Sequence, residues 1–181
     1  ADYAIMTDVL SLGYARTEED QPPQPAALSA VVDSTLSLVR TAIRHDKITL
    51  SVEIPDDLPE IRCRRQQIQQ VVMNLVTNAR DAINTKYPSP DDNKRITISA
   101  QPIEKNGEQW IRLTVHDTGK GISEDVQQRI YDPFFTTKGE GDGTGLGMWI
   151  VYRIVHDHGG DIAIETEPGE FTRFEIDLPG A

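Results

Sequence analysis

The sequence Asp117-Thr-Gly-Lys-Gly-Ile122 is followed by Asp132-Pro-Phe-Phe-Thr-Thr-Lys138 and then by glycine at every second position from Gly139 to Gly147. Alternating glycines leave backbone N–H groups unshielded by β-carbons, so the chain can bend sharply and lie against a bulky anion. From Thr144 the apolar residues take helical spacing, and a glycine-rich loop that leads into a helix N-terminus directs N–H groups and the helix dipole at an anion. We therefore expect a phosphate-binding lid over a bound nucleotide.

A glycine-rich segment that stands alone is more often a flexible surface loop. This region also lacks the two familiar phosphate-binding motifs. It contains no Gly-Lys-Ser/Thr of a P-loop, and Gly143-Thr-Gly-Leu-Gly147 has neither the spacing nor the preceding strand of a dinucleotide-binding turn. A nucleotide site here must be of a third type.

The composition is that of one main globular domain with an appendage: 181 residues, 38% hydrophobic and 26% charged. A net charge of -11 argues against a nucleic-acid-binding surface, because duplex binding depends on a basic face. No apolar run is long enough to span a bilayer, and no signal peptide is evident. We expect a cytoplasmic domain without a membrane segment. Its start at Ala1 suggests a fragment of a longer protein, which could carry a membrane anchor elsewhere.

Cys63 is the only cysteine, so the sequence excludes an internal disulfide and a cysteine metal cluster.

Three segments differ in composition. Residues 2–16 can form a helix, which is either a strut from another domain, a shortened dimerisation helix or a packed terminal helix. Residues 17–27 are acidic and rich in proline, which is typical of a linker. Residues 28–181 form the main domain. Within it, periodicity predicts helices at 28–44, at 64–87 and from 144, and strands at 47–54, 61–63, 95–100, 110–116, 161–166 and 171–178.

The predicted helix at 64–87 carries a polar column of Gln70, Asn74, Asn78 and Asp81 beside its apolar stripe. A solvated helix face is the simpler interpretation. Asparagine is a poor helix former, however, and two of them one turn apart at the core margin cost helix stability that some function should offset. An amide oxygen suits Mg²⁺, which takes few protein ligands and completes its shell with water and phosphate. Asn78 and Asn74 are the metal candidates.

Asp117 stands at the end of a predicted strand, directly before Gly119 and Gly121. A carboxylate there can accept a hydrogen bond from an exocyclic amino group, while a flat base lies against bare backbone. A β-turn is the alternative, since Asp-Thr-Gly also suits one. For His156 and His158, two positions apart on a helix, we favour solvated histidines at the helix end over a metal site.

Four segments together resemble the conserved boxes of sensor histidine kinases, of the GHKL superfamily with the Bergerat fold. They are Asn74-Leu-Val-Thr-Asn-Ala79, Asp117-Thr-Gly-Lys-Gly121, Asp132-Pro-Phe-Phe-Thr-Thr-Lys138 and Gly143-Thr-Gly-Leu-Gly147. The lid looks most like that of the nitrogen-regulator sensors. The resemblance covers residues 26–179. It implies an α/β (α+β) two-layer sandwich, a mixed sheet covered on one face by three helices, with ATP between the helices and the lid.

The resemblance also assigns roles. Asp117 receives the adenine amino group, with Gly119 and Gly121 giving the base room and Thr172 assisting through water. Asn78 holds Mg²⁺ with Asn74 near it, and Lys138 is a lid cation; these three are the catalytic candidates. Phe134 and Phe135 look like lid anchors that pack on the domain. The remaining residues implied in nucleotide binding are Thr137, Gly143, Thr144, Gly145, Leu146 and Gly147.

The chain departs from the family in places. Met148 replaces a usual Leu, with little consequence expected. Asp81 stands where many relatives carry a phosphate-contacting Lys or Arg, which places more weight on Lys138. No histidine precedes His45 and no phosphoacceptor box is present, so residues 1–16 look like the tail of the second dimerisation helix. The chain resembles the catalytic half of a longer, dimeric kinase.

Relatives that hydrolyse ATP place a Glu one helical turn before the metal Asn, where this chain has Asn74. An amide cannot act as a general base, whose assistance is worth roughly 10²- to 10⁴-fold, whereas a neutral imidazole is already a nucleophile. We therefore predict transfer of the ATP γ-phosphate to a histidine on a separate domain, for relay to a response regulator. A clamp-like ATPase and a nucleotide-sensing scaffold are the alternatives.

Overall fold

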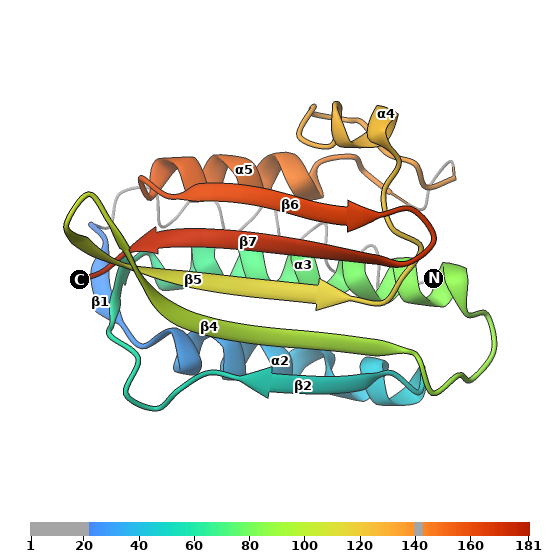
Figure 1. The fold of residues 1–181 in the computed structure, drawn as a ribbon, viewed down its shortest axis with the longest axis horizontal. Coiled ribbons are helices and arrows are strands. Elements are labelled where there is room, and N and C mark those ends of the chain that lie inside the picture. Colours follow the sequence, from blue (N-terminus) through green and yellow to red (C-terminus); the bar gives the residue numbers. More distant parts are fainter. Residues whose placement is uncertain (1–21, 140–142) are drawn as a thin grey trace.

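The computed structural model describes residues 22–139 and 143–181, which form a five-stranded sheet with helices on one side (Figure 1). In spatial order the strands are β2 (Thr49–Glu53), β4 (Arg95–Lys105), β5 (Glu108–Asp117), β7 (Phe171–Pro179) and β6 (Asp161–Glu167). β2 and β4 are parallel, and the other neighbouring pairs are antiparallel, so the sheet is mixed as predicted.

Three helices cover one face of this sheet: α2 (Leu28–His45), α3 (Arg65–Lys86) and α5 (Gly147–Asp157). Figure 1 shows all three behind the strands, with α3 between α2 and α5. A short α4 (Glu124–Gln127) stands above them, in a segment whose sequence carries no clear periodicity. The two-layer sandwich with three helices on one face is confirmed.

Alternation along the central strand builds the core. Ile111, Leu113 and Val115 of β5 are at most 1% exposed, and they point at the helix layer. On α3 the apolar stripe faces them, with Ile68, Val71, Leu75, Ala79 and Ile83 among its buried members. Because side chains two apart share a strand face, Asp117 at the end of β5 continues the inward-facing series. The fold therefore buries this carboxylate on the helix side.

The sequence boundaries need two corrections. A second, two-stranded ladder pairs β1 (Gln24–Ala26) with β3 (Ile61–Cys63), so the last residues of the predicted linker at 17–27 are paired with the domain. Pro25 is compatible with such a strand because proline is tolerated at sheet edges.

The hairpin of β4 and β5 is also longer than predicted, and it turns at Asn106 and Gly107, both with positive φ. The predicted helix at 2–16 lies outside the described residues.

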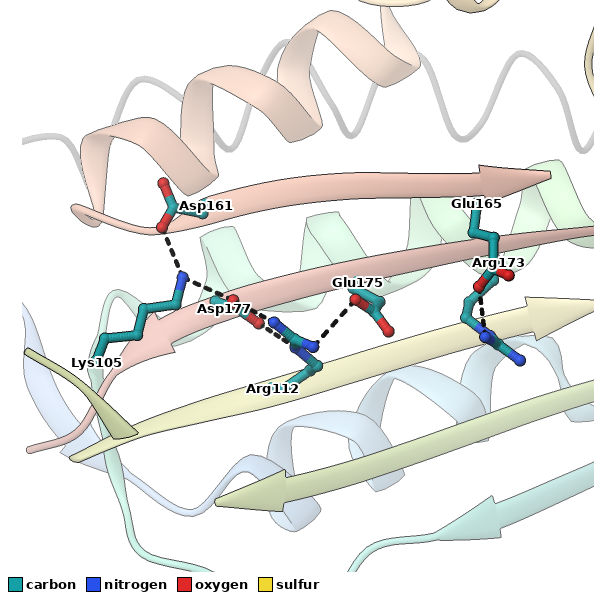
Figure 2. A network of polar contacts seen from close by, with 7 residues as sticks. All are labelled: Lys105, Arg112, Asp161, Glu165, Arg173, Glu175 and Asp177. Carbon is teal, nitrogen blue, oxygen red and sulfur yellow. Dashed lines mark hydrogen bonds and ion pairs between the residues drawn. The ribbon is translucent and has the colours of Figure 1, made fainter. Parts of the chain in front are cut away.

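The other face of the sheet carries paired charges instead of helices (Figure 2). The Asp177 carboxylate is 5% exposed and accepts two hydrogen bonds from Arg112, at 2.7 and 2.9 Å, while Lys105 Nζ lies 2.7 Å away. Burial acts to raise the pKa of Asp177, but these cations outweigh it and lower the pKa. Arg173 pairs with Glu165 further along. Matched charges allow this face to remain open to solvent.

His158 fastens the C-terminal end of α5 to the start of α3. It is buried, its Nδ1 lies 2.7 Å from the Ile154 carbonyl, and its Nε2 accepts the Arg64 backbone N–H at 3.0 Å. Burial lowers the pKa of His158, so the ring is neutral with its proton on Nδ1. The prediction of two solvated histidines is wrong for His158, because its ring is buried between the Ile154 carbonyl and the Arg64 N–H. It holds for His156, which is exposed.

His158→Ala should destabilise the fold by about 2 kcal/mol, because it removes the acceptor of a buried N–H. His156→Ala is the matched control and should change the free energy of unfolding by at most about 0.5 kcal/mol. Urea unfolding followed by circular dichroism measures both. Equal effects of the two substitutions would contradict the role assigned to His158.

Candidate nucleotide-binding site

Asp117 lies at the end of the central strand with a neighbouring strand on each side. Its register partners are Ile96 of β4 and Thr172 of β7. The residue is 4% exposed, and its Oδ1 accepts the Gly119 N–H at 2.8 Å. Burial raises the pKa of Asp117 to about 7, although the Gly119 hydrogen bond and the Lys86 ammonium partly oppose this. The other Asp117 oxygen accepts no hydrogen bond from the described residues, and such a buried carboxyl is suited to a polar ligand group.

Gly119 and Gly121 allow the loop after Asp117 to lie close to two parts of the protein. A β-carbon on Gly119 would be 2.6 Å from Asp117 Oδ1 and 2.7 Å from the Ala82 β-carbon. Gly121 has φ +67°, and its β-carbon would lie 2.1 Å from the Glu167 carbonyl oxygen. Any other residue at either position would clash. Close packing of the loop therefore explains why both positions are glycine. Their contact with a base stays a prediction.

Thr172 is brought beside Asp117, as the resemblance implies. It is 2% exposed and shares the inward face of the strands with Asp117. Its hydroxyl lies 3.1 Å from that of Thr166, which also accepts the Ile122 N–H at 3.0 Å and donates to the Phe171 carbonyl at 2.7 Å. Thr166 was not among the predicted site residues, although the pairing of the last two strands places it opposite Thr172.

Lys86 is a second residue that was not predicted from the sequence. Its Nζ donates to the carbonyls of Thr118 and Glu170, at 3.2 and 3.1 Å, so the last residue of α3 holds the loop after Asp117. Its positive charge also lowers the pKa of the Asp117 carboxyl, against the larger effect of burial. A basic residue in the last turn of a helix is common for its effect on the dipole alone, so the sequence offered no distinct signal.

The two asparagines of α3 differ in their contacts. Asn74 Nδ2 donates to the carbonyl of Gly147 at 3.1 Å, which ties α3 to the first residue of α5. Asn78 is half-buried, and its amide makes no hydrogen bond with the described residues. Within residues 22–139 and 143–181 there is no cluster of three His, Cys, Asp or Glu that would hold a metal ion alone. The available donors fit an ion that also takes phosphate oxygens, such as Mg²⁺.

The lid contacts α3 through Lys138. Its ammonium forms an ion pair with Asp81, and the two side chains are 37% and 39% exposed. The Lys138 N–H donates to the Thr136 hydroxyl at 3.1 Å, and a β-carbon on Gly143 would lie 2.7 Å from that hydroxyl. Lys138 therefore reaches the polar column that contains Asn74 and Asn78, but its charge is directed at a carboxylate.

The prediction that Phe134 anchors the lid is wrong. Its side chain is 75% exposed, and its backbone has φ +66°. Gly145, at φ +69°, lies so close that a β-carbon there would be 2.3 Å from the Phe134 carbonyl carbon. Backbone packing at this position turns the ring outward. Phe135 is half-buried, with the Arg129 guanidinium 4.4 Å from its ring centre.

The other predicted nucleotide contacts lie around the N-terminus of α5. Thr137 and Thr144 are both exposed, and the Leu146 N–H lies 3.4 Å from the Thr144 hydroxyl. Gly147 begins the helix, and a β-carbon there would meet nothing within 4 Å. An open helix N-terminus beside Asn74 is the geometry expected of an anion site.

Comparison with known proteins agrees with this geometry. Residues 63–181 match the family of histidine kinase-, DNA gyrase B-, and HSP90-like ATPases. The chain belongs to this family. It is 34% identical over 152 residues to the two-component sensor PprA of Pseudomonas aeruginosa, covering 83% of the chain and 16% of that protein. It is also 34% identical over 156 residues to the signal transduction histidine-protein kinase AtoS of Escherichia coli, covering 86% of the chain and 24% of that protein.

Among solved structures, the catalytic domain of the histidine kinase ThkA superposes with a TM-score of 0.71 at 28% identity, covering 87% of this chain and 95% of that one. The chain spans less than a quarter of the length of PprA and of AtoS. These findings confirm the GHKL fold and the ATP-binding domain of the sensor histidine kinases. The nitrogen-regulator branch stays a prediction. Among the described residues, no helix is long and apolar enough to cross a membrane.

Asp117→Asn should flatten the pH dependence of stability. A carboxyl whose pKa is raised in the folded state binds its proton more tightly there than in the unfolded chain. Stability is therefore greatest below the unfolded pKa of about 3.9 and is lost as pH rises to about 7. In the unsubstituted chain, urea unfolding should show that the free energy of unfolding falls by on the order of 3 kcal/mol between pH 5 and 8. An equal loss in the variant would contradict this assignment.

Proposed function

We propose that this chain is the catalytic domain of a two-component sensor histidine kinase, which transfers the γ-phosphate of ATP to a histidine on a separate dimerisation domain. A response regulator then receives the phosphate. The observation that carries the proposal is the side chain of Asn74. ATPases of this superfamily use a glutamate there, whereas this chain has an amide that donates to Gly147. An amide offers no base to activate water, so transfer to an imidazole is favoured over hydrolysis.

Asp117 recognises the adenine end of ATP in this proposal. Its carboxylate accepts from the exocyclic amino group, with Thr172 contributing through a bridging water and Gly119 and Gly121 lying along the base. The hydrogen bond from the Gly119 N–H to Oδ1 supports this role of Asp117, because it orients the carboxylate before a ligand arrives. The low exposure of Asp117 strengthens such a hydrogen bond, since water competes weakly there.

The phosphates lie between α3 and the lid. Asn78, with Asn74 next to it, would hold Mg²⁺, which supplies charge neutralisation on the phosphate oxygens. Lys138 adds a positive charge, and backbone N–H groups at Gly143, Gly145 and Gly147 donate to phosphate, with Thr137, Thr144 and Leu146 around them. A neutral histidine nitrogen attacks the γ-phosphorus as the bond to the ADP oxygen breaks. The chain's contribution is positioning and charge stabilisation.

The proposed partners follow from the same role. The phosphoacceptor histidine lies on a dimerisation domain of the parent protein, in the same or the other subunit of a homodimer. Residues 1–16 would be the tail of that domain's second helix, followed by a linker that ends before β1, and β1 would begin the catalytic domain. We propose that this domain works in the cytoplasm, where response regulators are found.

Phosphate transfer and hydrolysis can be distinguished in one experiment. The chain is incubated with saturating Mg-ATP, alone and with the dimerisation helices of its parent protein supplied separately. We expect negligible inorganic phosphate release from the chain alone and labelling of the helices when both are present. Asn78→Ala should abolish the labelling. Steady phosphate release that depends on Asn78 would identify an ATPase and contradict the proposal.

Asp81 should weaken ATP binding, because Lys138 cannot contact its carboxylate and a phosphate at once. Asp81→Ala should tighten ATP binding by up to about fivefold, the range expected for an exposed ion pair, and Lys138→Ala should weaken it. Asp33→Ala on the exposed face of α2 controls for the change in net charge. Isothermal titration calorimetry measures all three. Equal or weaker binding by Asp81→Ala would show that the ion pair does not compete with phosphate.

A further inference from the structure

A groove with a basic rim lies away from the nucleotide site, between the C-terminal end of α2 and the start of β2. It has a volume of about 420 Å³ and is lined by Arg40, Ile43 and Arg44 of α2 and by residues 47–50. Ile43 and Ile48 are buried beneath it, so its floor is apolar. None of the residues implied in nucleotide binding contributes to it. We call this feature the basic groove.

The cations of the basic groove are unpaired within residues 22–139 and 143–181. Arg40, Arg44 and Lys47 are exposed and form no ion pair there, in a chain with a net charge of -11. On the uncovered sheet face, by contrast, Lys105 and Arg112 are both matched by Asp177 (Figure 2). Three neighbouring positive charges without partners repel one another, which an acidic ligand would relieve.

The groove is bordered by a free strand edge. β2 is the outermost strand of the sheet, and the described residues place no strand beside its outer side. Thr49 N–H donates inward to the Lys94 carbonyl at 2.9 Å. Alternate residues of a strand direct their backbone groups to opposite sides, so the N–H and C=O groups of Leu50 and Val52 point to the free edge. Such an edge is a template for another strand.

The two edges of the sheet are protected differently. The opposite edge strand, β6, carries Asp161, Glu165 and Glu167 on its outward-facing side. β2 carries a single charged residue, Glu53, at its end, and Val52 is 36% exposed. Charged residues on an edge strand discourage pairing with other chains. β2 is therefore the edge that is open to a partner.

We propose that an extended acidic segment of another protein binds in the basic groove and adds a strand to the edge of β2. Register with Ile96 and Ile98 of β4 shows that Leu50 and Val52 face the helix layer. An added strand would direct every second side chain into the groove on this same side. The matching pattern is an apolar residue over Ile43 with a carboxylate two positions away on each side, near Arg40 and Arg44.

A second copy of this chain would fit less well. Pairing two β2 edges around a two-fold axis would bring the same unmatched cations together, and like charges across an interface oppose association. An acidic peptide has no such penalty, and its backbone can use the N–H and C=O groups of Leu50 and Val52. This surface is independent of the proposed kinase activity, since no residue of the groove contacts the nucleotide site.

The test uses the full chain, labelled with ¹⁵N, and a capped peptide of sequence Thr-Glu-Thr-Leu-Thr-Glu-Thr. We expect saturable NMR shifts centred on the Leu50 and Val52 amides, with binding that weakens as salt is added. Arg44→Glu should weaken binding roughly tenfold. The matched control is Arg62→Glu, which should leave binding unchanged. It reverses an exposed charge on β3, which pairs with β1 just before the first residue of α2, whereas the groove lies at the last turns of α2.

Two further peptides separate strand addition from simple charge attraction. A peptide with Lys in place of both Glu should not bind. A peptide that is N-methylated on both edges keeps its charges but loses its backbone donors, and it should bind far more weakly. Equal binding of the N-methylated peptide, equal binding by Arg44→Glu, or no shifts at about 1 mM peptide would each overturn the proposal. Circular dichroism confirms that both variants are folded.

Discussion

The site depends on one constraint, the position of Asp117 in the inward-facing series of the central strand. Its neighbours in that series, Leu113 and Val115, are fully buried core residues, and the alternation of β5 leaves the carboxylate no other direction. The cost of burying it appears as a pKa near 7. The fold tolerates this cost because Gly119 and Lys86 supply partial compensation and because the group faces the candidate nucleotide site.

α3 joins the parts of the site through one row of residues four positions apart. Asn74 contacts the start of α5. The amide of Asn78 makes no hydrogen bond with the described residues. The Ala82 carbonyl accepts the Lys120 N–H at 3.3 Å. The Lys86 ammonium donates to the carbonyls of Thr118 and Glu170, and so binds the loops that contain them. A shift of this helix would therefore move the loop after Asp117, the metal candidates and the lid contact together.

The sequence was sufficient for much of the fold. The structure places Thr172 beside Asp117 and puts Asn74 and Asn78 on one face of α3, and their roles in nucleotide binding stay predictions. Helical and strand periodicity predicted every long element within the described residues, because apolar faces are written into the order of residues. Three features were not predictable in this way. Lys86 and His158 act through contacts with residues distant in sequence, and the outward ring of Phe134 follows from backbone packing against Gly145. Such contacts depend on tertiary structure and leave no periodic signal.

The proposed hydrogen bond between the adenine amino group and Asp117 is the interaction that can be tested most directly. The decisive measurement is the affinity of this chain for inosine triphosphate relative to ATP, by calorimetry at pH 8 with Mg²⁺. Inosine carries a carbonyl oxygen where adenine has the amino group, so it would place an acceptor against the ionised carboxylate. We predict that inosine triphosphate binds at least about tenfold more weakly, because an unpaired buried carboxylate costs more than one ordinary hydrogen bond. Equal affinities for the two nucleotides would contradict the central role of Asp117.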